Sequence, residues 1–488
     1  MGKKIDVQRD VELSDAKTKG QIYTPDYLVS IILDQSGYTI GNISKHHIME
    51  NSCGNGQFLV QIVDRYCKDF LYNSSDKDIL ASELETYIHA IEIDNDELLV
   101  CRERCSLIAE SYGIARNIRW DFINGNSLNI KDFDGRMDYV IGNPPYVRIH
   151  NLSDNFDAVK SSLFGNSGMT DLFIAFYEIG IRMLNKNGTL CYITPSSFFT
   201  SIAGSNMRTF LVDNEMIKSV CDLKHFQPFD AITYTTIICL KNGVPTDKID
   251  YYEFDENRLK PIFIEKLEIS DFYINGLFYF SSKEKLLFLK KIFFSMLTAD
   301  IKVKNGYATL ADNVFVGDFL FGSKYIIPVV KASRGQLSKI IFPYDKNGKL
   351  ISEEVLKNET DLYSYLTENK NRLKKRSNEN SSDDYWFAFG RSQGINDTFT
   401  DKIAISSLIR NSFDLKTTFA PAGTGVYGGL YVVSGSIPME KICSVLKNEE
   451  FGNYISLLGK YKSGGYYTFS SKDVKRYLDY KLGVESGG

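Results

Sequence analysis

The chain has 488 residues, which is enough for two or more domains with sizeable hydrophobic cores. Its hydrophobic fraction of 43% and charged fraction of 24% are those of an ordinary globular protein. The first ten residues are polar and no apolar run approaches the length of a membrane span, so we expect neither a signal peptide nor a membrane protein. The eight cysteines show no regular framework, and Cys101 and Cys105 lack nearby histidines. We therefore expect no metal site, reduced thiols and a cytoplasmic location.

The net charge of −4 is unevenly distributed along the chain. Residues 301–488 contain 26 Lys and Arg against 20 Asp and Glu, a formal charge of +6, whereas residues 1–300 contain 31 against 41, a formal charge of −10. An acidic part joined to a basic part is compatible with DNA binding through the basic part. Chance asymmetry is the alternative.

The first strand and helix flank a glycine turn. Residues 47–49 predict a short strand and residues 60–70 an amphipathic helix, with Gly54 and Gly56 between them. The two glycines permit a tight turn and a close approach of the backbone to a ligand, although no phosphate-loop lysine follows. A carboxylate at the strand end, Glu50, suits a cationic amino group better than a phosphate. This favours S-adenosylmethionine, which carries an ammonium and a sulfonium.

A second strand is predicted over residues 88–94 and ends in acidic residues. A carboxylate at that position can accept hydrogen bonds from both ribose hydroxyls, and Glu92 is the first candidate, with Asp94 the second. The alternative for Asp94 is a cap of the helix predicted over residues 95–109. A third unit, residues 118–127, leads on to the fourth strand.

The most informative stretch is Asn143-Pro144-Pro145-Tyr146, which follows an apolar strand over residues 137–142. Neither proline can donate a backbone hydrogen bond, and each ring fixes φ near −65°. The Asn143 side-chain oxygen and the Pro144 carbonyl can therefore accept hydrogen bonds from an NH2 group, beside the flat face of Tyr146. This arrangement fits adenine, and a strand-to-turn break is the structural alternative.

Later elements complete an alternating pattern. A helix is predicted over residues 171–184, a stop at Asn187-Gly188, and strands over residues 189–194 and 232–240. Ligand sites of such sheets lie at the carboxyl ends of the strands, where Glu50, Glu92, Asn126 and Asn143 all fall. The sequence therefore predicts a Rossmann-like α/β domain over residues 1–245. A connector over 246–300, with a helix over 282–297, and a mixed α/β domain over 301–488 follow.

The ordered motifs resemble those of the gamma-class, or Taq-type, DNA adenine-N6 methyltransferases, which carry an N-terminal catalytic domain and a C-terminal target-recognition domain. Gly20 to Pro25 is similar to the motif at the methionine end of the cofactor, and Asp171-Leu172-Phe173 to the segment that lines its adenine. Residues 226–231 resemble the loop whose aromatic side chain packs on a flipped base, with Phe229 the first candidate and Phe226 the second. Two departures are Asn51, where proline is usual, and Asn126, where aspartate is usual.

The residues themselves and the resemblance together give three groups of candidate site residues. The catalytic group is Asn143, Pro144, Pro145, Tyr146 and Phe229. The cofactor group is Tyr23, Thr24, Glu50, Ser52, Cys53, Gly54, Gly56, Glu92, Ile93, Asn126, Ser127, Asn143 and Phe173. The DNA-binding group is Arg148, Arg334, Lys374, Arg376, Arg391 and Lys462, of which two lie in a cluster of five cations over residues 370–376. A solvated helix face is the alternative for this cluster.

The predicted function is site-specific methylation of N6 of a flipped-out adenine in double-stranded DNA, with S-adenosylmethionine as cofactor and no metal. The enzyme would be a solitary methylase or the modification half of a restriction–modification system. Because no nuclease domain has room before Gly20, we expect no cleavage and a separate cognate endonuclease in the second case. Cytosine-N4 methylation, RNA or protein-glutamine methylation, and a catalytically dead DNA-binding homologue are the alternatives. Cytosine-C5 methylation is not expected, since no Pro-Cys pair occurs.

Overall fold

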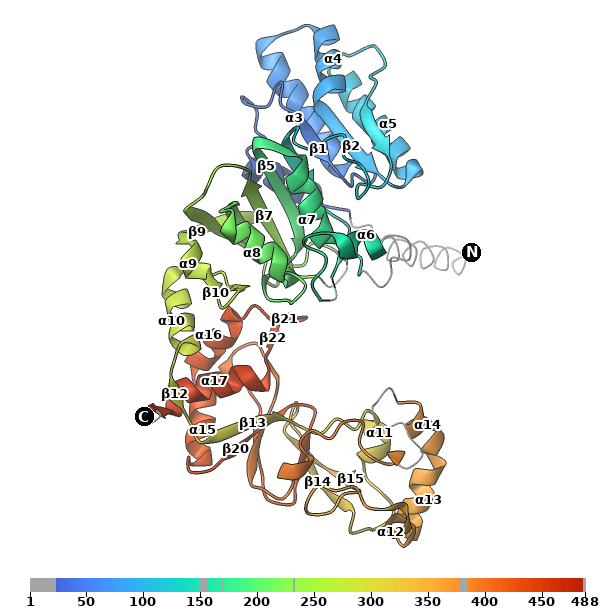
Figure 1. Ribbon diagram of the computed structural model, residues 1–488, viewed down its shortest axis with the longest axis vertical. Helices are drawn as coiled ribbons and strands as arrows, with labels where there is room; N and C mark the ends of the chain where they lie inside the picture. The colour runs from blue at the N-terminus through green and yellow to red at the C-terminus, as the bar shows by residue number, and fades with distance from the viewer. Residues whose placement is uncertain (1–22, 149–155, 169, 231–232, 377–384, 486–488) are drawn as a thin grey trace. The chain divides into compact units, whose positions relative to one another are not determined.

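The computed structural model describes residues 23–148, 156–168, 170–230, 233–376 and 385–485. The chain divides into two compact units between Leu286 and Leu287 (Figure 1). Gly20 to Ile22 of the first motif, and Ile232 at the start of a predicted strand, lie outside the described residues. Within the described parts of the chain, no helix is both long and apolar enough to cross a membrane.

The first unit is built on a nine-stranded sheet in the order β3-β2-β1-β4-β5-β7-β6-β8-β9. The strands are β1 (Ile48–Glu50), β2 (Ile88–Glu92), β3 (Asp121–Asn124), β4 (Met137–Gly142), β5 (Leu184–Pro195), β6 (Ile217–Asp222), β7 (Thr235–Lys241), β8 (Lys248–Asp255) and β9 (Lys260–Glu268). The five strands from β3 to β5 run parallel, and β7 runs antiparallel to both of its neighbours. The carboxyl ends of β1 to β5 therefore lie along one edge, as predicted for a ligand-binding α/β domain.

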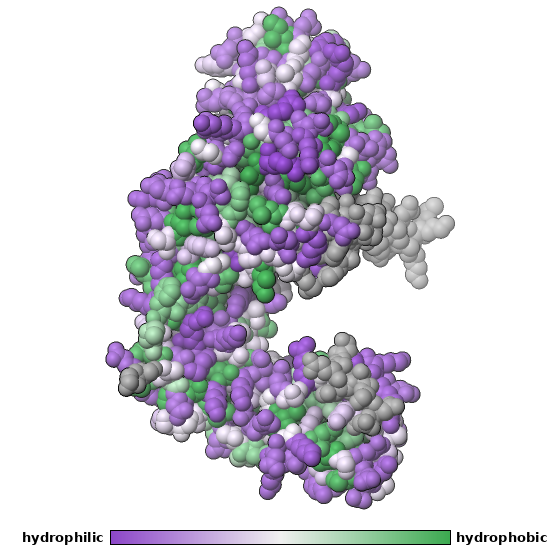
Figure 2. All heavy atoms as spheres, in the orientation of Figure 1, coloured by the Kyte–Doolittle hydropathy of each residue, from purple (hydrophilic) through white to green (hydrophobic). Residues whose placement is uncertain are grey.

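Helices cover this sheet. They are α2 (Asp26–Ser36), α3 (Gln57–Asn73), α4 (Lys77–Tyr87), α5 (Asn95–Ser111), α6 (Phe156–Ser161), α7 (Leu172–Met183), α8 (Ser205–Asp213) and α9 (Ile269–Phe272), with the 3-10 turn η2 (Ser196–Phe199) and a small hairpin of β10 (Tyr273–Ile274) and β11 (Leu277–Phe278). Apolar residues of α2, α3, α4 and α5 share one buried cluster with alternate residues of the central strands. On the face drawn in Figure 2, hydrophilic residues cover most of the outer surface of each unit.

Two predictions about this unit are wrong. The helix before β5 ends at Met183 and the strand begins at once, so Asn187-Gly188 lies inside β5. Asn187 takes a positive φ of 71° there, at an irregularity in the pairing of β4 with β5. The cysteines are also not all reduced, because Cys191 and Cys239 are register partners across β5 and β7 and form a disulfide. Cys101 and Cys105 are free thiols, as predicted.

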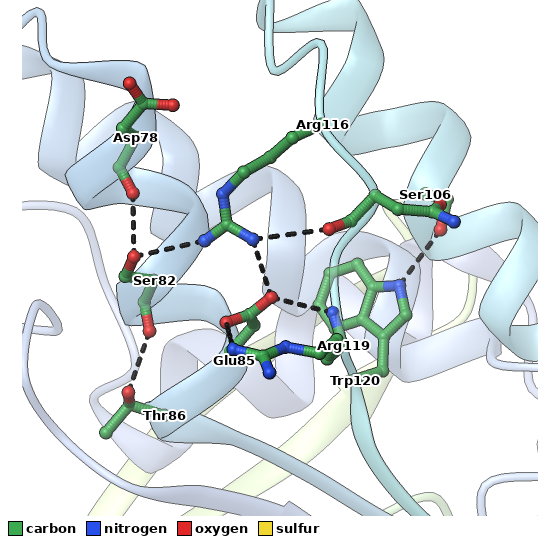
Figure 3. Close-up of polar contacts among 9 residues, drawn as sticks. Asp78, Ser82, Glu85, Thr86, Ser106, Arg116, Arg119 and Trp120 are labelled. Atoms are coloured by element: carbon green, nitrogen blue, oxygen red, sulfur yellow. Dashed lines mark hydrogen bonds and ion pairs between the residues drawn. The ribbon is translucent and has the colours of Figure 1, made fainter.

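A polar cluster ties α4 to the chain that leads into β3 (Figure 3). The Glu85 carboxylate accepts hydrogen bonds from the Arg116 guanidinium at 2.7 Å and from the Arg119 backbone N–H at 2.8 Å. Arg116 also donates to the Ser82 hydroxyl, and the Trp120 indole donates to Ser106 of α5. The Arg116 contact lowers the pKa of Glu85 to about 2. The cluster therefore fixes the outer edge of the sheet through one ionised carboxylate.

Replacing Glu85 with glutamine should lower stability at neutral pH by about 1 kcal/mol, since charge-assisted hydrogen bonds are lost at a partly exposed site. Because the pKa of Glu85 is depressed in the folded state, its contribution is present above the ordinary carboxyl value and is lost as pH falls toward 2. The melting temperatures of Glu85→Gln and of the unmodified protein should therefore begin to converge below about pH 4 and become nearly equal near pH 2. The exposed Glu110→Gln on α5 is the control, and a pH-independent difference would contradict the assignment.

The described residues of the second unit form four small sheets and several short helices. The unit is therefore a mixed α/β domain. Its sheets have the orders β13-β20-β16-β18, β15-β14-β19, β17-β22-β21 and β12-β23. The strands are β12 (Leu297–Thr298), β13 (Ile301–Asn305), β14 (Ile326–Lys331), β15 (Gln336–Ile341), β16 (Lys402–Ile405), β17 (Leu408–Ile409), β18 (Thr417–Ala420), β19 (Gly425–Tyr427), β20 (Leu430–Ser434), β21 (Tyr461–Lys462), β22 (Tyr466–Thr468) and β23 (Val484–Glu485). The helices are α11 (Asp312–Phe315), α12 (Glu353–Lys357), α13 (Thr360–Glu368), α14 (Lys370–Lys374), α15 (Met439–Leu446), α16 (Glu449–Leu457) and α17 (Ser471–Leu482), with the 3-10 turns η4 (Ile395–Asp397) and η5 (Ser412–Asp414).

The predicted domain boundaries differ from the limits of these two units. The sheet of the first unit continues through β8 and β9 to Glu268, past the predicted end of the catalytic domain at residue 245. The division at residues 286 and 287 falls inside the predicted connector, within α10 (Lys283–Phe293). The assignment of DNA recognition to the second unit stays a prediction.

Candidate functional site

The predicted site residues gather at the carboxyl edge of the parallel strands. Glu50 ends β1, Glu92 ends β2, and Asn143 follows β4 directly. Glu50 pairs in register with Ala90, and Glu92 pairs with Asn124 of β3. A Cβ added to Gly142 would lie 3.4 Å from Glu50 Cγ, so the Glu50 side chain reaches the end of β4. The strand order alone brings these residues, which are far apart in the sequence, to one edge.

The glycine turn is tied to the second strand. The Gly54 N–H donates to a Glu92 carboxylate oxygen at 2.8 Å, and the Cys53 N–H donates to the Ile91 carbonyl at 3.1 Å. Gly54 and Gly56 both take positive φ, 50° and 86°. A Cβ on Gly54 would meet nothing within 4 Å, whereas one on Gly56 would lie 2.7 Å from Cys101 Sγ of α5. Gly54 therefore leaves open space at the turn, and Gly56 permits close packing of the turn on α5.

Replacing Gly56 with alanine should destabilise the first unit by about 2–4 kcal/mol, because the strained φ and the overlap with Cys101 act together. Gly113→Ala is the matched control, since Gly113 has a φ of 85° but its Cβ would meet only Lys77 Cε at 3.8 Å. Thermal melting should show a clearly larger loss for Gly56→Ala than for the control. Equal losses would mean that the contact with Cys101 contributes nothing.

Glu50 is a buried carboxyl with an exposed fraction of only 2%. Its pKa is raised well above the usual range, chiefly by burial and further by Cys101 and Glu92, against a lowering hydrogen bond from the Leu59 backbone. Oxygen Oε2 is buried and has no hydrogen-bond partner among the described residues. A buried carboxylate oxygen without a partner is costly, so the site is suited to a cation that supplies the missing hydrogen bond.

Glu92 already accepts two backbone hydrogen bonds, from Gly54 N–H and from Asp94 N–H at 3.0 Å. Burial raises its pKa, although these hydrogen bonds oppose the shift. Asp94, the second candidate, caps α5 by accepting from the N–H groups of Asp96 and Glu97. The structure therefore favours Glu92 over Asp94 for a ligand, and Ile93 between them is exposed.

The predicted motif at residues 125–128 has mainly structural contacts. The buried Ser127 hydroxyl donates its proton to the Asn51 carbonyl at 2.6 Å, so that proton is not available to a cofactor. The Asn126 side-chain oxygen accepts the Leu128 N–H at 3.0 Å, as in a turn. Asn51 is not among the predicted residues, yet its amide nitrogen is buried without a hydrogen-bond partner in the described structure. Its position directly after Glu50 is the only signal in the sequence.

The motif at residues 143–146 meets the first motif. Asn143 Nδ2 donates to the Thr24 hydroxyl at 3.1 Å, across 119 positions of sequence. Thr24 is buried, and the preceding Tyr23 donates its hydroxyl to Glu97 at 3.1 Å. The Thr24 contact orients the Asn143 amide and leaves Oδ1 as the acceptor of that side chain. It also links the two motifs that the resemblance assigns to the cofactor and to the target base.

An aromatic group lies beside Asn143. The Tyr146 hydroxyl donates to the Ile193 carbonyl of β5 at 3.0 Å, and its ring lies edge-on to Phe173 at 6.3 Å and to Phe229 at 6.4 Å. Phe226 instead stacks on Phe254 of β8 at 4.8 Å. The structure therefore favours Phe229 over Phe226 as the ring beside Tyr146.

Two further predicted residues, Ser52 and Cys53, follow Glu50 in the glycine turn, and Cys53 is buried.

The predicted DNA-binding residues differ in exposure. The side chains of Arg148, Arg334, Arg391 and Lys462 are exposed, and Lys374 is half-buried. Arg376 is buried and donates to the carbonyls of Leu373, Thr309, Ala388 and Trp386. A guanidinium committed to four carbonyls cannot also bind a phosphate, so the prediction for Arg376 is wrong. Within the described ranges, no group of three or more His, Cys, Asp or Glu side chains is arranged to hold a metal ion.

Comparison with known proteins finds a family model that matches much of the first unit. Residues 58–229 match the family model described as "Eco57I restriction-modification methylase". The chain is 24% identical over 418 residues to the type II methyltransferase M.BstVI of Geobacillus stearothermophilus, which covers 75% of this chain and 73% of that protein. It is 22% identical over 506 residues to the type II restriction enzyme and methyltransferase RM.Eco57I of Escherichia coli, covering 82% of this chain and 51% of that protein.

Solved structures support the fold. The type IIL restriction–modification enzyme MmeI, solved in complex with DNA, is similar with a TM-score of 0.64 at 14% identity over 91% of this chain and 63% of that chain. A nuclease-deletion mutant of the type ISP enzyme LlaGI is similar with a TM-score of 0.57 at 12% identity over 95% of this chain. The chain thus spans only part of several of these longer proteins, 46% in the case of LlaGI.

The predicted α/β methyltransferase fold is confirmed by these similarities and by the strand order. The matched region contains the glycine-turn helix, Glu92, the Asn143 motif and Phe229. On this basis residues 58–229 match the Eco57I restriction–modification methylase family, and three quarters of the chain is similar to the type II methyltransferase M.BstVI.

Proposed function

We propose that this protein transfers a methyl group from S-adenosylmethionine to N6 of an adenine in double-stranded DNA. The observation that carries the proposal is the position of Asn143, whose amide is oriented by Thr24 at the edge where Glu50 and Glu92 also end their strands. M.BstVI is described as a type II methyltransferase, RM.Eco57I as a type II restriction enzyme and methyltransferase, and MmeI was solved with DNA. These descriptions support the same reaction here.

The residues of the glycine turn fit S-adenosylmethionine. Glu50 Oε2 and Asn51 Nδ2 are buried without hydrogen-bond partners in the described structure, and a Cβ on Gly54 of the same turn would meet nothing within 4 Å. Glu50 would bind the ammonium of the cofactor, and Glu92, whose oxygens still have lone pairs beyond the two backbone contacts, would accept from the ribose hydroxyls. When bound, S-adenosylmethionine supplies an electrophilic methyl group on a sulfonium.

Asn143 and Pro144 would act on the target amine. The lone pair of an exocyclic amine is delocalised into the base, which makes the nitrogen a poor nucleophile. Asn143 Oδ1 and the Pro144 carbonyl would accept its two N–H bonds and favour the sp3 nitrogen, whose lone pair then forms the new C–N bond while the S–C bond breaks. One N–H proton is lost from N6 after the transfer. Catalysis would rest on positioning and electrostatics, without a covalent intermediate.

Tyr146 and Phe229 would hold the extruded base. N6 cannot reach an in-line methyl donor while adenine is stacked in the duplex, so the base must leave the stack. The hydrogen bond from Tyr146 to β5 fixes that ring, and Phe229 packs against its edge. A rigid aromatic pair of this kind can compensate for the stacking that the extruded base loses.

The deciding experiment is methyl transfer from labelled S-adenosylmethionine into duplex DNA of mixed sequence, with the modified base identified and mapped. The proposal predicts N6-methyladenine in one recurring sequence. N4-methylcytosine would show that the related cytosine reaction is the true one. Absence of transfer to DNA, with the cofactor still bound, would overturn the proposal in favour of RNA or protein substrates.

Replacing Glu50 with glutamine should weaken cofactor binding roughly 10- to 100-fold at neutral pH, because a charge-assisted contact to the ammonium is lost. The pKa of Glu50 is raised in the folded state, so the protonated form stabilises the empty protein. That stabilisation is complete at low pH and is lost as pH rises through the raised value. Glu50→Gln without cofactor should therefore melt at a higher temperature than the unmodified protein at alkaline pH.

Calorimetric titration over a pH series provides the matching measurement. Cofactor affinity of the unmodified protein should rise with pH through the pKa of Glu50, with release of a proton on binding. Glu50→Gln should show neither effect. Identical pH profiles for the two proteins would exclude Glu50 as the ammonium ligand.

A further inference from the structure

The second unit contains a pocket of about 400 Å³ whose lining is basic. The lining residues used below are Arg334, Gly335, Phe413, Lys416, Thr418 and Lys447. Three of these residues are cations and none is acidic. The three cations lie in the turn between β14 and β15, directly before β18 and directly after α15, and the fold brings these three segments together.

No acidic residue lines the pocket to balance the charge of the three cations. In the described part of the chain, the side chains of Arg334, Lys416 and Lys447 form no hydrogen bond or ion pair. Lys447 follows the last turn of α15, where a cation is favourable by itself, but this does not account for the other two. Like charges gathered around one pocket repel each other, so the arrangement favours an anion supplied from outside.

The walls of the pocket are held by backbone contacts. The N–H groups of Arg334 and Gly335 both donate to the Lys331 carbonyl, at 3.0 and 2.8 Å. Gly335 has a positive φ of 66°, and a Cβ there would lie 3.0 Å from the Thr418 hydroxyl oxygen. The hairpin turn is thus packed against β18. The cations are therefore presented by a defined surface, which reduces the ordering cost of binding.

An exposed aromatic ring forms the rim. Phe413 is 79% exposed, yet its loop is firmly anchored. Asn411 accepts from the N–H groups of Phe413 and Asp414, and Ser412 is buried. Arg410 donates to the Gly464 carbonyl at 2.9 Å, and its guanidinium lies 4.5 Å from the centre of the Tyr466 ring. A large apolar ring held in solvent beside three cations is typical of a nucleic-acid contact.

We infer that this pocket binds the sugar–phosphate backbone of the DNA substrate, with Arg334, Lys416 and Lys447 on the phosphates and Phe413 against a sugar or base. The inference rests on the proposed function and assigns DNA contact to one surface of the second unit. In the cluster at residues 370–376, by contrast, Arg376 is buried and donates to backbone carbonyls, and Lys370 lies 4.6 Å from the centre of the Trp386 ring.

The test uses the full chain and a short fluorescent duplex of mixed sequence, with anisotropy measured from about 0.05 to 0.2 M salt. The triple variant Arg334→Ala, Lys416→Ala, Lys447→Ala should bind roughly 10- to 100-fold more weakly. Its slope of log affinity against log salt should fall by about 2–3, since each phosphate contact contributes about 0.9. Phe413→Ala should lose roughly 5-fold or more in affinity with an unchanged slope.

Matched variants separate charge from folding. Lys302→Ala, Lys346→Ala, Lys441→Ala removes three exposed cations outside the pocket and should leave the slope nearly unchanged. Arg334→Lys, Lys416→Arg, Lys447→Arg keeps the charges and should keep the slope. Equal slopes for the unmodified protein and the alanine triple variant would overturn the pocket assignment alone. If the unmodified protein shows no salt-dependent DNA binding, the proposed function and the pocket assignment both fail.

Discussion

Replacing Asn143 with alanine should lower the methyl-transfer rate by at least 10²–10³-fold, while cofactor and DNA binding stay within a few fold. The reason is that Asn143 Oδ1 would accept a hydrogen bond that strengthens as N6 becomes sp3 in the transition state. Removal of such a contact lowers kcat and kcat/KM together. Single-turnover rates with saturating cofactor, measured beside equilibrium binding of both ligands, would separate the two effects.

Asn185→Ala is the matched control for this prediction. Asn185 lies near the start of β5, at the edge of the sheet opposite to Asn143, where its amide donates to Asp138 at 2.8 Å. Loss of that hydrogen bond should cost about 1 kcal/mol of stability without changing the rate. Near-normal methylation by Asn143→Ala would refute the mechanism. Loss of cofactor binding would instead assign Asn143 a structural role through Thr24.

The parallel core of the first unit could be predicted from the sequence because its strands are buried on both faces. β4 runs from Met137 to Gly142, as predicted, since a mostly apolar run is bounded by the prolines that follow. Glu50, Glu92 and Asn143 then fall at one edge as a consequence of the parallel order. The contact of Asn143 with Thr24 depends on tertiary packing over 119 positions, and no local pattern indicates it.

Other features depend on contacts that local sequence does not reveal. Five cations in seven positions indicated a phosphate-binding face, but Arg376 turns inward because four carbonyls from distant segments converge on it. Ser127 matches its motif, yet its hydroxyl proton is used by the Asn51 carbonyl. Lys416 and Lys447 lie far apart in an unremarkable part of the sequence, and only the fold brings them to Arg334. Composition can indicate a basic domain without indicating which cations face a ligand.

Removal of the second unit should separate cofactor binding from target recognition. A fragment of residues 1 to about 300 retains the nine-stranded sheet and its hydrophobic cluster, which are made entirely of first-unit residues. It should therefore bind S-adenosylmethionine within a few fold of the full chain. It loses the basic pocket and the positive charge of residues 301–488, so its DNA affinity should fall by roughly 10²-fold or more and its sequence preference should disappear.

Cofactor titration of the fragment, followed by mapping of methylated adenines in mixed-sequence DNA, provides the measurement. The full chain carrying Asn143→Ala is the complementary control, since it should bind the target sequence but not methylate it. Full sequence selectivity in the fragment would refute the assignment of recognition to the second unit. Weak methylation without sequence preference would place the chemistry at the carboxyl edge of the first unit and the choice of site in the second, because phosphate attraction contributes affinity while base contacts contribute specificity.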